Sequence, residues 1–323
     1  MSQDATSQAG LYVRVVRRTQ EAESIVSLEL AATNDGDPLP RYEPGSHIDV
    51  NIGGVIRQYS LCGDPAGPTW RIAVLKEPQS RGGSRAMHEQ TPVGTILQVG
   101  MPRNLFRLDE SAPAILVAGG IGITPILAMA RALSAAKKTF ELHYCARRPE
   151  VMAFRDELES ADFHGAVQFY FNDGDASRPF DAIDVLRESP LDAQLYICGP
   201  AGFIDYVESA AQTVGWAANR VHRESFAPVS GQNCDGSFQI RLLSDGRLLN
   251  VDEGTTALQV LLDAGVDVPY SCENGICGSC LTAIVEGVPD HRDQFMTDAE
   301  RARNNQFTPC CSRAHTPQLV LDL

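Results

Sequence analysis

The sequence predicts a multidomain protein of the β and α/β classes: an antiparallel β-barrel, a parallel α/β domain and a small cysteine-rich domain. Three observations carry this prediction. Short β-branched runs fill the first third, strands and helices then alternate, and the last segment holds five of the nine cysteines. We place the domains at residues 1–110, 111–227 and 238–323, with a linker at 228–237.

The first domain is predicted from strand-like runs with partial alternation, separated by Gly- and Pro-rich turns. The runs are LYVRVVRRTQ, IVSLELAA, HIDVNI, RQYSL and RIAVLKE. Short alternating strands at this spacing are typical of an all-β domain. A small antiparallel barrel is the simplest arrangement that buries one face of each strand.

The second domain opens with PAILVAGG, an apolar run that ends in glycines, as a buried parallel strand does. A helix follows, for which we expect Thr124 as N-cap, Pro125 at the first position, and Lys137 and Lys138 at the C-terminal end. Further strands (FELHYCA, AVQFYFND, AQLYICGP) alternate with helices (AFRDELES, AGFIDYVESAAQTVG). Such alternation predicts a parallel sheet with helices on both faces.

The third domain follows a Gly-, Ser- and Pro-rich stretch, FAPVSGQNCDGS, which is typical of a linker. FQIRLLSDGRLLNV predicts a hairpin that turns at Asp245 and Gly246, and TALQVLLDAG predicts a helix. The cysteine loop comes directly afterwards.

Composition narrows the class of protein. The net charge of −14 makes nucleic acid an unsuitable partner and favours a protein with a basic docking face. No apolar run approaches the roughly 20 residues of a membrane span, and the polar N-terminus lacks a signal sequence. We therefore expect a cytoplasmic monomer whose cysteines serve as metal ligands or reactive thiols rather than disulfides.

The loop CENGICGSC spaces Cys272, Cys277 and Cys280 as C-x4-C-x2-C. Structural zinc usually takes paired C-x2-C arms, and only one pair here has that separation. The wider first gap is the plant-type ferredoxin spacing for a [2Fe–2S] cluster. The alternatives are a zinc site or spare buried thiols.

A fourth thiolate must come from a distant strand, and two adjacent candidates exist, Cys310 and Cys311. A strand points neighbouring side chains to opposite faces, so only one of them can easily face the cluster. The loop glycines Gly275 and Gly278 let backbone N–H groups turn towards the sulfurs.

Two motifs predict a nucleotide site. In GGIGITP, Gly120 and Gly122 stand between a strand and a helix, where a diphosphate can approach the backbone. In YICGP, Cys198 ends another strand and would face the same crevice. Pro125 stands where the dinucleotide fingerprint has a third glycine, so a tight structural turn and a core cysteine are the alternatives.

RQYSL and RGGS predict a third site in the barrel. Alternation places Arg57, Tyr59 and Leu61 on one face of a strand, with Gln58 and Ser60 on the other. A cation, an aromatic plane and a hydroxyl suit an isoalloxazine with a phosphate tail. The turn Gly82–Gly83–Ser84 can present N–H groups to that phosphate. An ordinary strand and turn is the alternative.

Together, and in this order, the motifs resemble the ferredoxin–NADP reductase superfamily. Within it they resemble the phthalate dioxygenase reductase family, which includes vanillate demethylase reductases. The likeness runs from about residue 11 to the C-terminus, through RQYSL, RGGS, PRNLF, GGIGITP, CGPAGF, CENGICGSC, DHRD, CCSRA and LVLDL. It implies a flavin-binding antiparallel barrel, a Rossmann-like nucleotide domain and a C-terminal β-grasp [2Fe–2S] ferredoxin domain.

The resemblance also implies cofactors, partner and site residues: FMN, NADH as donor and a Rieske-type terminal oxygenase as acceptor. The implied flavin residues are Arg57, Tyr59, Ser60, Val74, Lys76, Gly82, Gly83, Ser84, Thr124 and the covering aromatic Phe226. The implied NADH residues are Gly120, Gly122, Cys198, Gly199 and Pro200. The implied cluster ligands are Cys272, Cys277, Cys280 and Cys310, the last favoured by the family's Cys-x-Ser-Arg ending.

No segment matches an adenylate site, which favours FMN over FAD. Arg147 and Arg148 depart from the expectation for NADH, because an arginine can hold the 2′-phosphate of NADPH. NADH delivers two electrons at once and a cluster takes one, so a flavin must stand between them. Ser60 is expected near flavin N5, and Cys198 beside the nicotinamide. Two alternatives are a stand-alone flavin reductase with a structural cluster, and a non-catalytic carrier or zinc-containing assembly protein.

Overall fold

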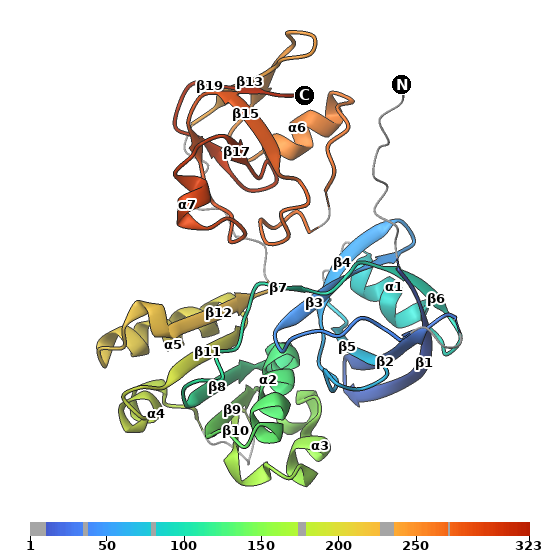
Figure 1. Cartoon of the computed structure of the whole chain (residues 1–323), viewed down its shortest axis with the longest axis vertical. Helices are drawn as coiled ribbons and strands as arrows, with labels where there is room; N and C mark the ends of the chain where they lie inside the picture. The colour runs from blue at the N-terminus through green and yellow to red at the C-terminus, as the bar shows by residue number, and fades with distance from the viewer. Residues whose placement is uncertain (1–10, 35–37, 79–81, 174–178, 227–235, 271) are drawn as a thin grey trace. The chain divides into compact units, whose positions relative to one another are not determined.

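The computed structural model describes residues 11–34, 38–78, 82–173, 179–226, 236–270 and 272–323. The chain divides into two compact units, Met1–Phe226 and Ala227–Leu323 (Figure 1). Most of the expected linker, 228–235, lies outside the described residues, and the domain boundaries stay predictions. None of the helices in the described ranges is long and apolar enough to cross a membrane.

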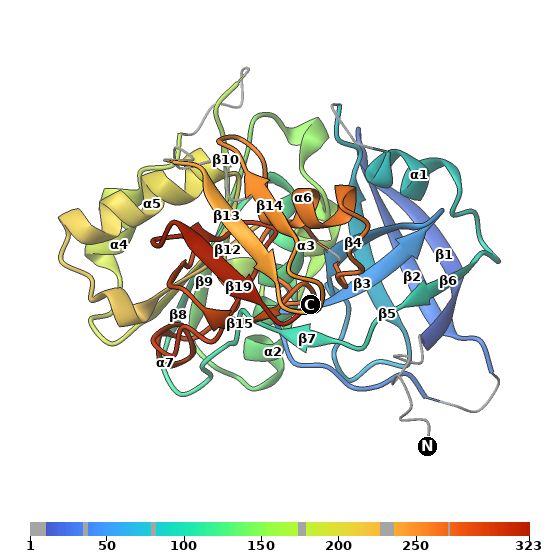
Figure 2. The same ribbon diagram turned by 90° about the horizontal axis from the view of Figure 1, so that it is seen from above.

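The first unit begins with an antiparallel barrel in the strand order β4-β3-β6-β1-β2-β5, with β7 paired to β3. A bridge between Leu61 and Ile72 joins the end of β4 to β5 and closes the barrel. Helix α1 (Gly83–Glu89) packs against β3, β4 and β5 (Figure 2). The strands are β1 (Leu11–Ala22), β2 (Ile25–Ala32), β3 (Ser46–Ile52), β4 (Val55–Ser60), β5 (Trp70–Leu75), β6 (Ile96–Val99) and β7 (Arg103–Asn104). The predicted barrel is confirmed.

The same unit continues as a parallel sheet in the order β10-β9-β8-β11-β12. Alternate β8 residues face opposite ways: Leu116 packs with residues of α2 and α3, and Val117 with residues of α4 and α5. Figure 1 shows these two pairs of helices beside the sheet. The elements are β8 (Ala114–Gly119), α2 (Ile123–Ala135), β9 (Phe140–Ala146), α3 (Arg155–Ser160), β10 (Val167–Phe171), α4 (Ala182–Glu188), β11 (Gln194–Gly199), α5 (Ala201–Thr213) and β12 (Val221–Ser225). Helices therefore cover both faces, as predicted.

The expected N-terminus of α2 is wrong. A 3-10 turn at Gly120–Gly122 runs straight into the helix, so α2 begins at Ile123 and Gly122 is its N-cap. Thr124 lies inside the helix, and its hydroxyl donates to the Ile121 carbonyl at 3.1 Å instead of capping an amide. The helix ends at Ala135, so the two predicted lysines follow it rather than lie in its last turn.

A partly buried ion-pair network joins the barrel to the parallel sheet. Arg71 of β5 donates to both carboxylate oxygens of Glu157 in α3, at 2.7 and 3.0 Å, and Arg131 of α2 pairs with the same carboxylate. The Arg71 guanidinium also lies 4.7 Å from the ring centroid of Phe154. Bidentate pairs of this kind fix geometry as well as contribute energy, so the network holds the two halves of the unit in one arrangement.

The second unit contains a mixed sheet in the order β14-β13-β19-β15-β17. Figure 2 shows β14, β13 and β19 of this sheet. The hairpin turns at Gly246, which has φ +74°, as predicted. Helix α6 (Ala257–Asp263) packs its leucines into the core of this sheet. The remaining elements are β13 (Phe238–Leu242), β14 (Leu248–Val251), β15 (Thr282–Glu286), β16 (Pro289–Asp290), α7 (Asp298–Arg301), β17 (Gln306–Phe307), β18 (Arg313–Ala314) and β19 (Gln318–Leu321).

Candidate functional site

The carboxyl ends of β8 and β11 meet where the order of the parallel sheet reverses, which is where open α/β sheets bind ligands. Gly122 is essential to this meeting, because a Cβ there would overlap the Cys198 carbonyl and lie 2.7 Å from the Gly199 amide nitrogen. Gly120 has φ +56°, and a Cβ on it would meet nothing within 4 Å. The predicted nucleotide residues thus lie together at the carboxyl ends of β8 and β11, where the crevice is expected, and Pro200 is the N-cap of α5.

Three buried polar side chains connect this crevice to the barrel. Cys198 of β11 lies opposite Glu224 of β12 in the sheet register. The Ser60 hydroxyl, at the end of β4, donates to the Glu224 carboxylate at 3.4 Å. Sequence reasoning missed Glu224, which lies two positions before Phe226.

Burial governs the protonation of this group. Burial raises the pKa of Glu224 to about 8, whereas the hydrogen bond from Ser60 lowers it by a smaller amount. Burial, followed by the nearby Glu224 charge, raises the pKa of the Cys198 thiol well above its ordinary value. At neutral pH the group therefore holds a protonated carboxyl and a neutral thiol, rather than a thiolate nucleophile.

We expect Glu224→Gln to remove a pH dependence of stability. Because the native state holds this proton more tightly than the unfolded chain, the contribution of Glu224 is fully present below pH 4.5 and is lost as the pH rises through 8. The loss is about 1.4 kcal/mol per pH unit at most. Thermal unfolding of the flavin-free protein at pH 6 and pH 9 should show a smaller difference in the variant; parallel profiles would contradict the assignment.

The two halves of the expected flavin motif lie together in the barrel. Arg57 of β4 packs against the start of α1, where its Cγ lies 2.9 Å from the position of a Cβ on Gly83. Gly82 precedes this with φ +104°, and Ser84 accepts from the Glu77 amide at 3.1 Å. An arginine beside a glycine turn at a helix start suits a phosphate. Phe226, directly after β12, is 39% exposed, so its ring is accessible to a flat cofactor.

Other expected flavin residues are held by protein contacts. Val74 is buried in the barrel core, and His88 contacts its carbonyl oxygen at 2.9 Å. Lys76 pairs with Glu89 at 3.4 Å. Tyr59 packs partly against the barrel core, where burial raises its pKa above the ordinary range. Thr124 is buried in α2, as described above. Direct contact with a flavin stays a prediction for these four residues, as it does for Arg57, Ser60, the Gly82–Ser84 turn and Phe226.

In the second unit, the thiols of the four expected ligand cysteines lie as neighbouring pairs, Cys272 with Cys277 and Cys280 with Cys310, and the Cys310 thiol also neighbours that of Cys311. All four are at least 94% buried. The Asn274 and Ser279 amides donate to Cys272 Sγ and Cys277 Sγ at 3.3 and 3.4 Å, so backbone N–H groups do turn towards sulfur.

These pairs fit a two-iron centre. Within each pair, the interaction between the thiols lowers the pKa of one, Cys277 to about 5 and Cys280 below its ordinary value, and raises that of its partner. Within the described ranges, no three His, Cys, Asp or Glu side chains are placed to hold one ion. A zinc site gathers four ligands around one ion, whereas a [2Fe–2S] cluster takes two per iron. Two neighbouring pairs of thiols therefore suit a [2Fe–2S] cluster.

The fold and these sites define an oxidoreductase with separate nucleotide and iron–sulfur domains. Residues 116–209 match the family model "Oxidoreductase NAD-binding domain", and residues 240–315 match "2Fe-2S iron-sulfur cluster binding domain". The chain is 50% identical over 306 residues to a vanillate O-demethylase oxidoreductase of Pseudomonas sp., covering 94% of this chain and 96% of that one. It is 39% identical over 318 residues to phthalate dioxygenase reductase of Burkholderia cepacia, covering 97% of each.

A solved structure supports the same relationship. The structure titled as phthalate dioxygenase reductase, "a modular structure for electron transfer from pyridine nucleotides to [2Fe-2S]", superposes with a TM-score of 0.74 at 39% identity and covers 98% of both chains. This chain belongs to the phthalate dioxygenase reductase and vanillate O-demethylase oxidoreductase family.

Proposed function

We propose that this chain is the reductase component of a two-component oxygenase, in which electrons pass from NADH through FMN and the [2Fe–2S] cluster to a Rieske-type terminal oxygenase. One observation carries the proposal: a single chain holds both a buried Ser60–Glu224–Cys198 group at a nucleotide crevice and two pairs of cysteines suited to iron. The Ser60–Glu224–Cys198 group suits hydride transfer, and the cysteine pairs suit a cluster that carries one electron at a time.

We assign the residues as follows. Gly120, Gly122 and Pro200 shape the crevice for NADH, and Cys198, as a neutral thiol, packs beside the nicotinamide. Ser60 orients the edge of the flavin ring. Glu224, which is protonated at neutral pH, lies within hydrogen-bond distance of Ser60 at the same edge. Bound FMN supplies the change from two-electron to one-electron transfer. Arg57 and the Gly82–Ser84 turn hold the phosphate, Phe226 covers the ring, and Cys272, Cys277, Cys280 and Cys310 hold the cluster.

The partner we propose is an O-demethylase that acts on a methoxylated aromatic acid, in the cytoplasm. Its support is the identity of 50%, 47% and 45% to three vanillate O-demethylase oxidoreductases, against 39% to phthalate dioxygenase reductase.

The proposal predicts the cofactors of the purified protein. Its absorption spectrum should show flavin and [2Fe–2S] bands, and denaturation should release FMN at about one per chain. Chromatography of the supernatant identifies the flavin. Stoichiometric FAD would contradict the flavin assignment, and a colourless protein would contradict both cofactors and favour the assembly-protein alternative.

We also expect a preference for NADH over NADPH. Arg148 is engaged by Glu23 and lies 3.7 Å from Glu150, so it is not placed to receive a 2′-phosphate. Asp173, two residues after β10, donates its amide to the Arg147 carbonyl at 2.9 Å, so an acidic residue lies at the C-terminal ends of β9 and β10. An acidic group at the strand ends favours a ribose diol. Steady-state kinetics with cytochrome c should give a kcat/KM at least about tenfold higher with NADH.

Asp173→Ala should narrow this preference by raising the kcat/KM for NADPH. Glu159→Ala, which removes a carboxylate paired on the surface of α3, serves as the control. A wild-type preference for NADPH would show that the arginines recognise the 2′-phosphate.

A further inference from the structure

In the second unit, residues 290–296 run between the cysteine loop and the segment that carries Cys310. We call residues 290–296 the strap. The Gln294 amide donates to the Gly275 carbonyl at 2.9 Å. The Arg292 amide donates to Ser312 Oγ at 3.2 Å. The strap therefore ties together the two parts of the chain that supply the cluster ligands.

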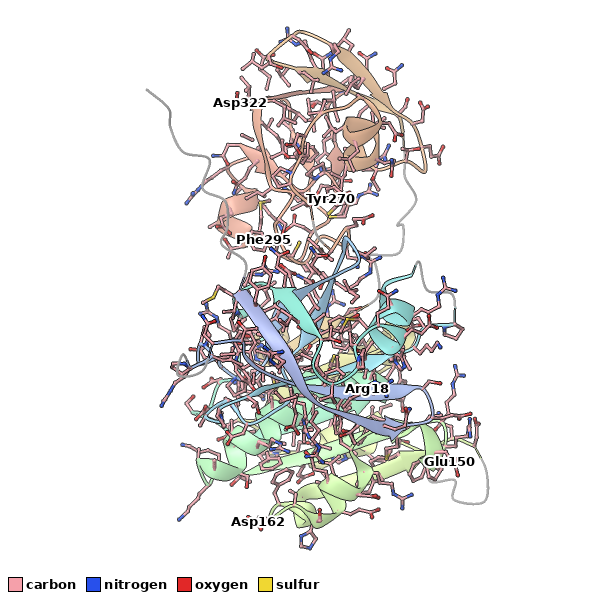
Figure 3. The ribbon with its side chains drawn as sticks, turned by 90° about the vertical axis from the view of Figure 1, so that its right-hand side faces the viewer. Arg18, Glu150, Asp162, Tyr270, Phe295 and Asp322 are labelled. Carbon is pink, nitrogen blue, oxygen red and sulfur yellow. The ribbon has the colours of Figure 1, made fainter. Side chains whose placement is uncertain are left out.

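Strap residues pack closely against the two loop glycines, Gly275 and Gly278, that have left-handed backbone conformations. Gly275 has φ +71°, and a Cβ there would lie 3.1 Å from Asp293 Cα and would overlap Cys311 Sγ. Gly278 has φ +69°, and a Cβ there would lie 2.5 Å from the Phe295 ring. Since these two glycines flank Cys277, the strap limits the conformations that the loop can adopt. In Figure 3, Phe295 lies at the same end of this unit as Tyr270, which shortly precedes the loop, and Asp322 lies at the opposite end.

Asp293 holds the strap in this shape. Its side chain is fully buried, and Oδ2 accepts from the amides of Phe295 at 3.1 Å and Met296 at 2.7 Å. Arg301 Nη2 donates to the Asp293 carbonyl and lies 3.7 Å from Oδ2. His291 Nδ1 lies 3.9 Å from Oδ1, which accepts no hydrogen bond within the described residues. A buried carboxylate that accepts two backbone amides defines a local turn that a neutral, shorter side chain cannot reproduce.

We propose that Asp293 is a positioning residue for the iron–sulfur centre. Its carboxylate fixes the turn that places Phe295 against Gly278 and the Asp293 backbone against Gly275, and its charge lies beside the cluster loop. This inference rests on the proposed function, because it assumes that the cysteine pairs hold the cluster. Two consequences follow. The carboxylate holds the ligands in place, and it makes addition of an electron to the centre less favourable.

Two substitutions separate these consequences. Asn at position 293 keeps an oxygen for the two amides but removes the charge, so Asp293→Asn should retain iron and shift the midpoint potential to a more positive value. Asp293→Ala removes the acceptor as well, so it should lose iron to a chelator about tenfold faster than the wild type. Asp290→Asn is the matched control: it makes the same change of charge in the same segment, at a residue that pairs with Arg292 and contacts neither glycine.

Amide hydrogen exchange in the iron-free protein gives a readout that does not depend on the cluster. The amides of Phe295 and Met296 should exchange faster in Asp293→Ala than in Asp290→Asn. An unchanged midpoint potential in Asp293→Asn, or equal iron release from Asp293→Ala and the control, would overturn the inference. A wild-type protein without iron would overturn the proposed cluster site instead, while the exchange experiment would still report on the strap.

Discussion

Cys310→Ser should abolish the [2Fe–2S] cluster, the largest effect that we expect from a single substitution. Cys310 is 96% buried and pairs with Cys280, so its loss leaves one half of the ligand set with a single thiolate. The variant should contain little iron and give no reduced EPR signal. It should still bind flavin and reduce ferricyanide with NADH, but it should fail to drive an oxygenase.

Cys311→Ser is the control for this experiment. Cys311 Sγ lies 3.3 Å from Thr308 Oγ1 and faces Gly275, so it occupies a hydroxyl-lined position beside the core and not the position paired with Cys280. A serine there finds a hydrogen-bond partner, which reduces the cost of about 1–3 kcal/mol for an unpaired buried hydroxyl. Loss of the signal in Cys311→Ser, with a normal signal in Cys310→Ser, would reverse the ligand assignment.

Gly122→Ala should disable the nucleotide crevice. The added Cβ would overlap the Cys198 carbonyl and lie 2.7 Å from the Gly199 nitrogen, and both are backbone atoms of a buried strand that cannot rotate away. Overpacking of this kind costs about 1–3 kcal/mol and moves the β8 and β11 ends apart. A shift near 1 Å at the reacting groups can lower kcat/KM for NADH about a hundredfold.

Gly202→Ala is a matched control for that substitution. Gly202 lies in the first turn of α5, close in sequence to the same crevice, and a Cβ there would meet nothing within 4 Å. This change should leave kcat/KM near the wild-type value and make stability equal or slightly higher. Flavin content measures whether each variant remains folded. Equal kinetics in the two variants would show that the close approach of Gly122 to Cys198 is not needed for NADH.

The local motifs were the most predictable part of the site, because their spacing is itself the chemistry. The C-x4-C-x2-C run predicted the loop, and Gly275 and Gly278 were expected to be permissive turns; both have positive φ. Alternation along RQYSL predicted that Arg57 and Ser60 leave opposite faces of one strand. In the structure Arg57 packs against α1 while Ser60 meets β12.

Long-range contacts were not predictable in the same way. Glu224 was missed because its partner Ser60 is 164 residues away, and nothing local marks the carboxyl as buried. The role of Thr124 as N-cap was wrong because the preceding turn already had helical geometry, which residue preferences alone do not report. Arg148 could not be judged from sequence, since its partner Glu23 comes from the barrel.

The sequence by itself determined the class of each domain, the ligand spacing of the cysteine loop and the family, because periodicity, turn residues and motif spacing are local properties of the chain. Only the tertiary structure decided which cysteines pair, that Glu224 joins Ser60 to Cys198, and that Asp293 holds the strap against two glycines. The physical reason is that these features arise from burial and from hydrogen bonds between distant segments. Such interactions exist only once the strands have closed around their cores and excluded water.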